Sequence, residues 1–343
     1  MFAICTTGKA DGTVELRQVD APKLSPTDIL VKVVAAAQNP ADWKASGWQT
    51  DVKIVGCDYA GIVTQIGSES VTEDVKIRDR IAGMVFGCVE MNGAFAEYVA
   101  VPSHIFFKIP ESWSFEDASQ LGIACYTACQ CLYQSQNLPS PENPTTTPID
   151  LLVWGGSSSV GHFVIQLAKL GGMRVITTAS PKHFDRLKAL GVDETFDYRD
   201  PEVAQKIRAY TNGKLQHAVD CISEGSTPQL VSDSVASEGG TVSAILKYET
   251  VRPEVKVVFS VGYTLFGKPF GDFTPSTEMN EFATKSSKLI SKLLADGKLT
   301  PAPLKIYPKG LASISEGLEY MKSGKVSGEK LVYRVADTPG IQA

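Results

Sequence analysis

A glycine- and serine-rich segment between an apolar run and an amphipathic run constrains the fold of this chain most strongly. The run Ile149–Trp154 has the composition of a buried strand, and Val160–Leu170 has helical periodicity. Between them, the pattern G-x-G-x-x-G is present as Gly156-x-Ser158-x-x-Gly161. Serine replaces the middle glycine, yet small residues still let the backbone approach a phosphate, and helix N-terminal amides bind anions. We predict a dinucleotide-binding loop, the alternative being an ordinary glycine-rich turn; its candidate residues are Gly156, Ser157, Ser158, Ser159, Val160 and Gly161.

The sequence after this loop alternates between short strands and helices. Strands are predicted at 174–178, 194–197, 217–222 and 240–246, and helices at 182–190, 201–210 and 228–234. This alternation is typical of a parallel sheet with helices on both faces, which is a doubly wound α/β domain. Further helices are expected at 277–296 and 313–323, followed by a closing strand at 330–335.

The first third of the chain has a different pattern. Residues 1–110 are β-rich, with strands predicted at 14–19, 29–35, 60–66 and 95–101. A helix is expected at Ser114–Tyr133 with Ser114 as its N-cap. The proline-rich segment Ser135–Pro148 is expected to be a surface loop. A chain of 343 residues usually forms two domains, so we expect a β-rich domain followed by an α/β domain.

The overall composition argues against several classes of function. The net charge of −5 argues against nucleic-acid binding, which needs a basic surface. No apolar run approaches the ~20 residues that cross a bilayer, and no signal peptide is visible, so we expect a cytoplasmic protein without membrane contact. The seven cysteines are odd in number and scattered, which is typical of buried thiols in a reducing compartment rather than of a disulfide framework.

The end of the second α/β strand distinguishes the two nicotinamide cofactors. NAD-binding loops carry an Asp or Glu there for the ribose 2′-hydroxyl. In this chain, Ser180 and Lys182 instead offer a hydroxyl and a cation to a 2′-phosphate. Tyr198, after the third strand, could reach the same phosphate. The sequence therefore favours NADPH, although a solvent-exposed lysine at a helix start is the alternative for Lys182.

Several motifs ahead of the glycine loop resemble the medium-chain dehydrogenase/reductase superfamily, and the resemblance covers nearly the whole chain. They are Asn39-Pro40-Ala41-Asp42, Gly56-Cys57-Asp58-Tyr59-Ala60-Gly61, Asp79-Arg80-Ile81, Gly93-Ala94-Phe95-Ala96-Glu97-Tyr98 and the segment from Leu121 through Thr127-Ala128. More narrowly, the chain is similar to the fungal trans-acting enoyl reductases that serve polyketide synthases. That narrower resemblance rests on the proline-rich loop and on Ser180-Pro181, Phe196-Asp197-Tyr198-Arg199, Asp220-Cys221-Ile222, Thr264-Leu265-Phe266-Gly267 and Ser327-Gly328-Glu329-Lys330-Leu331.

The resemblance implies an α/β fold with two domains. A chaperonin-10-like distorted β-barrel would form the catalytic domain at 1–125 and 298–343, and a Rossmann domain with a doubly wound parallel sheet would bind NADPH at 126–297. In zinc-dependent members, Cys, His and Cys hold a catalytic zinc, and the matching positions here carry Asn39, Cys57 and Ile123. Asn and Ile do not complete a zinc site, so the expected enzyme works without a metal.

Without a metal, the reaction that fits is conjugate reduction of an activated carbon–carbon double bond. Hydride passes from NADPH to the β-carbon of an enoyl thioester or enone, and hydrogen-bond donors stabilise the resulting enolate. The resemblance implies Lys44 and Thr127 as catalytic residues, with Lys44 a proton donor or cofactor anchor; a surface lysine and a core threonine are the alternatives. The expected cofactor contacts outside the glycine loop are Asn39, Asp42, Lys44, Ser180, Lys182, His183, Tyr198, Ile245, Leu246, Ser327 and Gly328.

Three functions remain open from the sequence. The first is a trans-acting enoyl reductase, with a polyketide synthase and its carrier domain as partners. The second is a free-standing quinone or enone reductase, and the third is a non-catalytic NADPH-binding sensor or scaffold. The nicotinamide-side and phosphate-side motifs are both present, which weighs against the third. We expect a monomer, because the narrower resemblance is to monomeric reductases and the predicted edge strand near 255–261 is followed by Lys268 and Pro269, which discourage edge pairing.

Overall fold

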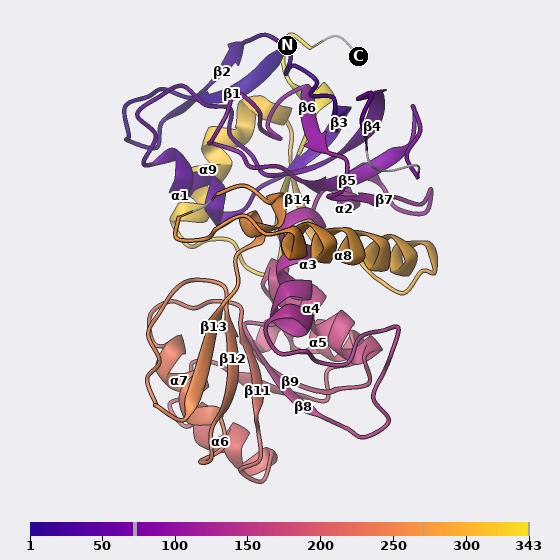
Figure 1. Cartoon of the computed structure of the whole chain (residues 1–343). Helices are drawn as coiled ribbons and strands as arrows, with labels where there is room; N and C mark the ends of the chain where they lie inside the picture. Colours follow the sequence, from indigo (N-terminus) through magenta and orange to yellow (C-terminus); the bar gives the residue numbers. More distant parts are fainter. Residues whose placement is uncertain (71–73, 270, 342–343) are drawn as a thin grey trace. The chain divides into compact units, whose positions relative to one another are not determined.

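The chain forms two compact units in the computed structural model, which describes residues 1–70, 74–269 and 271–341 (Figure 1). One unit is made of Met1–Ile123 with Tyr263–Ala343, and the other of Ala124–Gly262. The first is built on a mostly antiparallel sheet and the second on a parallel sheet with flanking helices. This confirms the predicted α/β class with a β-rich part and a doubly wound part.

The second unit is a doubly wound sheet whose described strands run parallel to their neighbours. The strand order is β10-β9-β8-β11-β12-β13. Figure 1 shows α4 (Ser159–Leu170) and α5 (Phe184–Ala189) beside one face, and α6 (Val203–Tyr210) and α7 (Thr227–Ser234) beside the other. The strands are β8 (Asp150–Trp154), β9 (Arg174–Ala179), β10 (Glu194–Asp197), β11 (His217–Asp220), β12 (Gly240–Ala244) and β13 (Val255–Phe259).

Burial explains why these segments form a parallel sheet. All residues of β8 and β9 except the first of each are buried, which is typical of strands covered on both faces. The helices are amphipathic and bury one side against the sheet. Val203 and Ile207 of α6, for example, join Leu152 and Ile176 in one apolar core. The predicted alternation of strands and helices is therefore confirmed.

Two elements of this unit differ locally from the prediction. The helix expected at 182–190 begins as a 3₁₀ turn at Pro181–His183, because the His183 N–H bonds back three residues to the Ser180 carbonyl. Strand β11 ends at Asp220 rather than at Ile222. The Asp220 carboxylate accepts the N–H groups of Ile222 and Ser223, and this turns the chain away from the sheet.

The first unit is built around a sheet of order β14-β15-β3-β4-β5-β7, in which β6 also pairs with β3. The pairing of β3 with β4 contains two register shifts, and such bulges bend a strand and increase its twist. This allows β3 to pair with β15 at one end and with β6 at the other. The strands are β1 (Phe2–Thr6), β2 (Val14–Gln18), β3 (Asp28–Ala37), β4 (Asp58–Ile66), β5 (Arg80–Met84), β6 (Tyr98–Pro102), β7 (Phe106–Lys108), β14 (Leu304–Tyr307) and β15 (Lys330–Arg334).

The helices of the first unit follow or precede these strands. They are α1 (Pro40–Ser46), α2 (Phe115–Ala118), α8 (Thr277–Ala295) and α9 (Ile314–Lys322). The strand expected at 95–101 is shortened to β6, because the Phe95 N–H bonds to the Val55 carbonyl instead of to a neighbouring strand of the sheet. No described helix combines the length and apolar composition that a membrane span requires.

The helix expected at Ser114–Tyr133 is divided into pieces. They are α2, α3 (Gly122–Cys129) and a π-helical turn at Gln130–Gln134. Ser114 caps α2 as predicted, since its hydroxyl accepts the Asp117 N–H. The helix is interrupted after α2 because the next turn is bonded elsewhere: the Ile123 N–H donates to the Asp58 carboxylate at 2.8 Å.

The boundaries of the two units differ from the predicted domains at one place. The first boundary, between Ile123 and Ala124, lies close to the predicted one after residue 125. The second lies between Gly262 and Tyr263, whereas the sequence placed it after residue 297. Helix α8 groups with the first unit because it bonds there: Ser291 Oγ accepts the Lys108 N–H at 3.0 Å. Residues 342–343 of the predicted range 298–343 lie outside the described residues.

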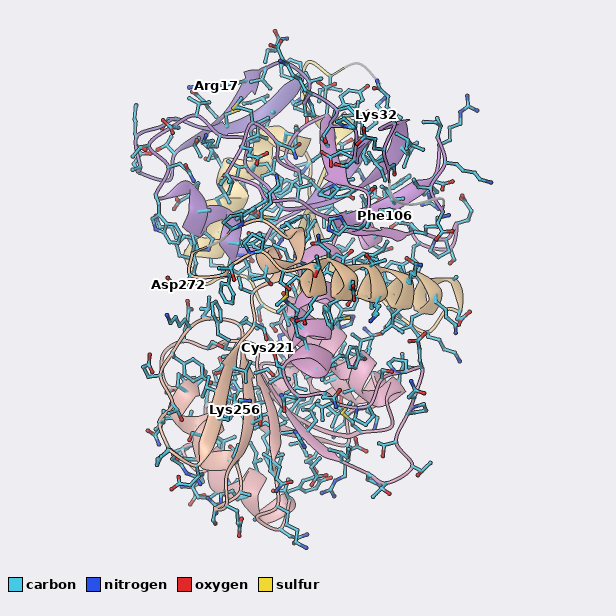
Figure 2. All side chains as sticks on the ribbon, viewed as in Figure 1. Arg17, Lys32, Phe106, Cys221, Lys256 and Asp272 are labelled. Carbon is cyan, nitrogen blue, oxygen red and sulfur yellow. The ribbon has the colours of Figure 1, made fainter. Side chains whose placement is uncertain are left out.

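Strand β13 stands at one end of the sheet order of the second unit, as expected for 255–261. Its exposed residue, Lys256, is labelled in Figure 2. A lysine on an edge strand discourages pairing with a strand of another chain, because its charge would have to be brought into the extended sheet. The sequence analysis expected Lys268 and Pro269 to discourage edge pairing. Lys256, on the edge strand itself, is a further residue of this kind.

Candidate active site

The glycine loop of the second unit is packed too closely for side chains at two of its positions. Gly155 has a left-handed backbone, with φ +80°. A Cβ on Gly156 would lie 2.1 Å from Thr177 Oγ1, and one on Gly161 would lie 2.4 Å from the Gly155 carbonyl oxygen. These close approaches join β8, β9 and α4 at the loop, which is the role that glycines have in dinucleotide-binding turns.

The serine at the middle position of the pattern has a structural task. Ser158 Oγ accepts the Gly161 N–H at 3.1 Å and so caps α4, a helix of 12 residues. Its hydroxyl hydrogen can still donate to an anion. Ser157, Ser159 and Val160 are half-buried, like Ser158. The loop thus offers N–H donors, a hydroxyl and the positive end of a helix, which together fit a phosphate.

The residues predicted to bind a 2′-phosphate follow two neighbouring strands, β9 and β10. Ser180 is half-buried, Lys182 is exposed, and Tyr198 is 46 % exposed. His183 belongs to the same turn as Lys182; burial lowers its pKa, and the nearby Arg186 and Lys182 cations lower it further. The carboxyl ends of neighbouring parallel strands lie at the same edge of a sheet, so these residues follow β9 and β10 at one edge, where Lys182 supplies a cation and Ser180 and Tyr198 supply hydroxyl groups.

The turn after β11 is organised by Asp220, a buried residue to which the sequence analysis gave no role. Besides the N–H groups of Ile222 and Ser223, its carboxylate accepts the Thr227 hydroxyl at 2.8 Å. Ser223 Oγ then accepts the N–H of Ile245, one of the predicted cofactor residues. Strands β8 and β11 are the neighbours at which the strand order reverses, and ligands of open α/β sheets bind at the carboxyl ends of such strands.

Two further predicted residues of this unit have less exposed positions. Leu246 directly follows Ile245 and is half-buried. Thr127 lies on α3 and is 5 % exposed. Both positions suit a residue that packs in the interior as well as one that contacts a ligand, so the catalytic role of Thr127 stays a prediction.

In the first unit, β3 leads into α1 through a buried Asn–Asp pair. Asp42 Oδ2 accepts the Asn39 N–H at 2.6 Å, and the two residues are only 4 % (Asn39) and 1 % (Asp42) exposed. Burial raises the pKa of Asp42 to about 7, against hydrogen bonds from the Asn39 N–H and the Cys57 thiol that lower it. A carboxyl with this pKa can hold or release a proton near neutral pH, which general acid catalysis requires.

A buried lysine from the closing strand holds this pair in place. Lys330 Nζ lies 2.6 Å from Asn39 Oδ1 and 3.1 Å from Asp58 Oδ2. The side chains of Lys330 and Asp58 are 2 % and 0 % exposed. Asp58 Oδ1 in turn accepts the Ile123 N–H at 2.8 Å. One continuous hydrogen-bond network therefore connects β15, β4, the residue before α1 and the first turn of α3.

Cys57 and a row of aromatic rings lie next to this network. Cys57 Sγ is 3.1 Å from the Tyr263 hydroxyl oxygen. Burial, and then the charge of Asp42, raises the pKa of Cys57 well above its ordinary value, so the thiol stays protonated. The Tyr263 ring stacks on Phe86 with centroids 4.5 Å apart, and Phe86 stacks on Phe266 at 5.8 Å. Cys57 is thus a structural thiol beside an aromatic wall formed by Phe86, Tyr263 and Phe266.

The positions that match zinc ligands in the resemblance have protein partners here. Asn39 Oδ1 accepts from Lys330, Cys57 Sγ shares a hydrogen bond with Tyr263, and Ile123 offers only its backbone N–H, which is bonded to Asp58. Within the part of the chain that the structure describes, no group of three or more His, Cys, Asp or Glu residues is spaced to hold a metal ion.

The remaining predicted residues of the first unit are Lys44, Ser327 and Gly328. Lys44 is half-buried on α1, and its Nζ lies 5.6 Å from the centre of the Trp43 ring. Ser327 is exposed, and Gly328 has a left-handed φ of +68° two residues before Lys330. The structure therefore brings Asn39, Asp42 and Lys44 together on one turn, while the glycine-loop and 2′-phosphate candidates form a separate group in the second unit.

Asp58, Lys330 and Asp220 are the polar residues that sequence reasoning left without a role. Asp58 and Lys330 are the first residues of β4 and β15, and Asp220 is the last residue of β11. A charge buried at a strand terminus needs an opposite charge or hydrogen bonds. From this requirement alone, the sequence could have predicted that Asp58 and Lys330 each have a charged or hydrogen-bonding partner. The two residues are 272 positions apart in the chain, so the sequence gave no local indication that they meet.

Comparison with known proteins gives a consistent result. Residues 25–111 match the family model of the alcohol dehydrogenase GroES-like domain, and residues 159–283 match that of the zinc-binding dehydrogenases. The trans-enoyl reductase ACTTS2 of Alternaria alternata is 40 % identical over 334 residues, which cover 95 % of this chain and 97 % of that protein. The trans-enoyl reductase FSL5 of Gibberella zeae is 37 % identical over 343 residues, covering 96 % of each.

The fold has a solved counterpart. The crystal structure of an alcohol dehydrogenase superfamily protein from Novosphingobium aromaticivorans superposes with a TM-score of 0.78 at 22 % sequence identity. The match covers 97 % of this chain and 98 % of that one. This agreement confirms the predicted combination of a GroES-like part and a Rossmann-like sheet.

Proposed function

We propose, on the premise that this chain belongs to the trans-enoyl reductases of the medium-chain dehydrogenase/reductase superfamily, that it reduces the α,β double bond of an enoyl thioester carried by a polyketide synthase. The observation that supports this chemistry is the state of the zinc-ligand positions: Asn39, Cys57 and Ile123 are engaged with protein partners. Carbonyl–alcohol chemistry in this superfamily uses zinc as its Lewis acid. Conjugate reduction needs only donors that stabilise an enolate, so we propose a reaction without zinc.

The proposed cofactor is NADPH, which supplies the hydride when it is bound. The N–H groups at the start of α4 and the Ser158 hydroxyl would hold the pyrophosphate. Ser180 and Lys182, with Tyr198, would hold the 2′-phosphate, and no acid is present at Ser180–His183 to favour NADH. The family resemblance adds His183, Ile245, Leu246, Ser327, Gly328 and the Asn39–Lys44 turn as cofactor contacts.

The protein's own contribution to the reaction is orientation and charge stabilisation. Lys44 is proposed as the proton donor to the α-carbon or as a cofactor anchor, and Thr127 as a contact to the cofactor. The aromatic wall of Phe86, Tyr263 and Phe266 offers an apolar surface that suits an acyl chain. Such a surface excludes water and so strengthens the hydrogen bonds that act on the substrate.

The proposed partner is the carrier domain of a polyketide synthase, which would present its tethered chain to a monomeric reductase in the cytoplasm. The names of its relatives state that they are trans-enoyl reductases, and the carrier-bound substrate, the monomer and the cytoplasmic location are our proposals for this chain. Neither a membrane nor a nucleic acid is a proposed partner. The exposed Lys256 on edge strand β13 supports the monomer, because it disfavours strand pairing between two copies.

The proposal is tested by the choice of acceptor. Full-length protein is assayed with NADPH and three acceptors: a crotonyl chain on a carrier domain, the same crotonyl group on free pantetheine, and a small quinone. We expect kcat/KM to be highest for the carrier-bound chain and lowest for the quinone. A preference for the quinone would instead support a free-standing quinone or enone reductase.

A further inference from the structure

The orientation of the Asn39 amide is fixed by a cation on one side. Lys330 Nζ carries only donors, so the amide atom 2.6 Å from it is the oxygen, Oδ1. Nδ2, with its two N–H groups, is therefore the atom on the other side of the amide. It is buried and has no hydrogen-bond partner within the described residues.

The carboxylate of Asp58 lies near this amide without satisfying it. Burial raises the pKa of Asp58, and the Lys330 ammonium and the side chain of Asn39, which faces the carboxylate, both oppose that rise. The contact falls short of hydrogen-bonding geometry at Nδ2, and at most one of its two N–H groups can point at Asp58, so at least one N–H is left without an acceptor. Buried polar groups without a partner are rare in native proteins, and the exceptions commonly mark the position of a ligand or a water.

The surroundings hold this unsatisfied donor rigidly. The Asn39 backbone N–H is bonded to Asp42 at 2.6 Å, and its side-chain oxygen is bonded to Lys330. Lys330 is bonded to Asp58, which is bonded to the Ile123 N–H. A donor that is already fixed before the ligand arrives loses little free energy to reorganisation when charge develops opposite it.

We propose that Asn39 Nδ2 donates a hydrogen bond to the carbonyl oxygen of the enoyl thioester, and that Lys330 is the positioning residue that aims this donor. The inference rests on the proposed function and deepens it. It assigns the enolate-stabilising donor of the reaction to Asn39, which the family resemblance placed among the cofactor contacts and at a zinc-ligand position.

The chemistry explains why a donor is needed at this atom. The β-carbon accepts the hydride, and a carbon–hydrogen bond forms there while the π pair moves toward the α-carbon and the carbonyl oxygen. The oxygen gains negative charge, so a hydrogen bond to it becomes stronger in the transition state than in the bound substrate. The α-carbon then takes a proton from an acid or from water, and the carbonyl re-forms. Asn39 keeps its protons throughout, while the Lys330 ammonium polarises the amide through its oxygen.

The variant Asn39→Asp tests the proposal, because it keeps an oxygen for Lys330 and replaces the Nδ2 donor with an acceptor. Full-length protein is measured in single turnovers with NADPH and crotonyl-pantetheine, and NADPH affinity is measured by fluorescence. We expect hydride transfer to slow by about 10²–10³-fold, the usual effect of removing one such donor. KM for crotonyl-pantetheine should stay within about threefold of wild type, because the lost interaction belongs to the transition state. NADPH affinity is measured so that the rate is compared at saturating cofactor.

A matched control is available in the same unit. Asn92 Nδ2 donates to the Ala100 carbonyl, and its Oδ1 accepts the Ala100 N–H, so both sides of this amide are satisfied by backbone. Asn92→Asp should leave the rate of hydride transfer unchanged. Lys330→Arg keeps a cation opposite Asn39 Oδ1 and should retain most of that rate.

A spectroscopic measurement reports directly on the carbonyl. The infrared frequency of a ¹³C-labelled thioester carbonyl, bound in the presence of NADP⁺, should be lower in wild type and Lys330→Arg than in Asn39→Asp. Equal frequencies or equal rates in wild type and Asn39→Asp would overturn the inference alone. If Asn39→Asp does not fold, a wild-type frequency no lower than that of the thioester in an apolar solvent would overturn it. Wild-type protein that binds NADPH but reduces no enoyl thioester would overturn the proposed function as well.

Discussion

Lys330 Nζ and Asp58 Oδ2 lie 3.1 Å apart, and the two side chains are 2 % and 0 % exposed. Replacing Lys330 with Met would leave a buried carboxylate without its cation. We expect the free energy of unfolding to fall by ~3 kcal/mol, at the low end for a broken buried pair, because Asp58 can take up a proton. Urea denaturation measures this loss.

The control for Lys330→Met is Lys108→Met. Lys108 Nζ lies 3.5 Å from Asp79 Oδ2, and these side chains are 47 % and 29 % exposed. Water screens a pair of this kind, so its loss should lower the free energy of unfolding by less than ~1 kcal/mol. Equal losses in the two variants would contradict the assignment of Lys330 as the central cation of the network.

The buried Asp42 predicts a particular dependence of stability on pH. Its pKa is raised by burial to about 7 in the folded chain, whereas an exposed aspartate has a pKa of ~3.9. Between these values the folded state binds more protons than the unfolded state, so the free energy of unfolding decreases as pH rises. Measured against Asp42→Asn, wild-type protein should lose stability as pH rises from about 4 to about 7, and the loss should level off above that range. Parallel curves for the two proteins would show that the Asp42 pKa is not raised.

The cofactor preference depends on the turn after β9. Lys182→Ala should weaken NADPH binding by ~1–2 kcal/mol and leave NADH binding unchanged, because only NADPH carries the 2′-phosphate that this cation would pair with. Fluorescence titration of both cofactors measures the difference. Lys188→Ala, at an exposed lysine of helix α5, which directly follows the turn that carries Lys182, is the control and should change neither affinity. A loss of affinity for both cofactors with Lys182→Ala would point to a role other than binding the 2′-phosphate.

The occupied zinc-ligand positions predict activity without a metal. Prolonged treatment with a strong chelator should leave the rate of enoyl reduction unchanged, since Asn39 and Ile123 supply no thiolate or imidazole. Elemental analysis of purified protein before treatment is the companion measurement. Stoichiometric zinc together with loss of activity on chelation would contradict the proposed reaction.

Much of the fold could be predicted because its signals are local. Strand β8, the glycine loop and α4 follow one another in the chain, and each has its own composition and periodicity. The interruption of the helix before Gly122 and the start of β6 at Tyr98 were not predicted. They depend on partners elsewhere in the chain, such as Asp58 for the Ile123 N–H. The grouping of α8 with the first unit likewise depends on a distant partner, since its hydrogen bond to β7 spans more than half of the sequence.

The candidate site was predicted in part. The phosphate loop carries its pattern in six consecutive residues, and Asn39 and Asp42 belong to one motif. In the sequence analysis, Lys330 appeared only as part of a family motif. Its role arises from burial beside Asn39 and Asp58, and burial of a lysine depends on the tertiary structure. The monomeric state, the cytoplasmic location and the catalytic roles of Lys44 and Thr127 stay predictions.

The mass of the acyl chain on its carrier tests the central claim most directly. A carrier domain loaded with a crotonyl group is incubated with full-length protein and NADPH, and the acyl-pantetheine fragment is analysed by mass spectrometry. Reduction of the double bond should raise the mass by about 2 Da in wild type and far more slowly in Asn39→Asp, because the enolate would lose its donor. An unchanged mass with wild-type protein that has bound NADPH would contradict the account.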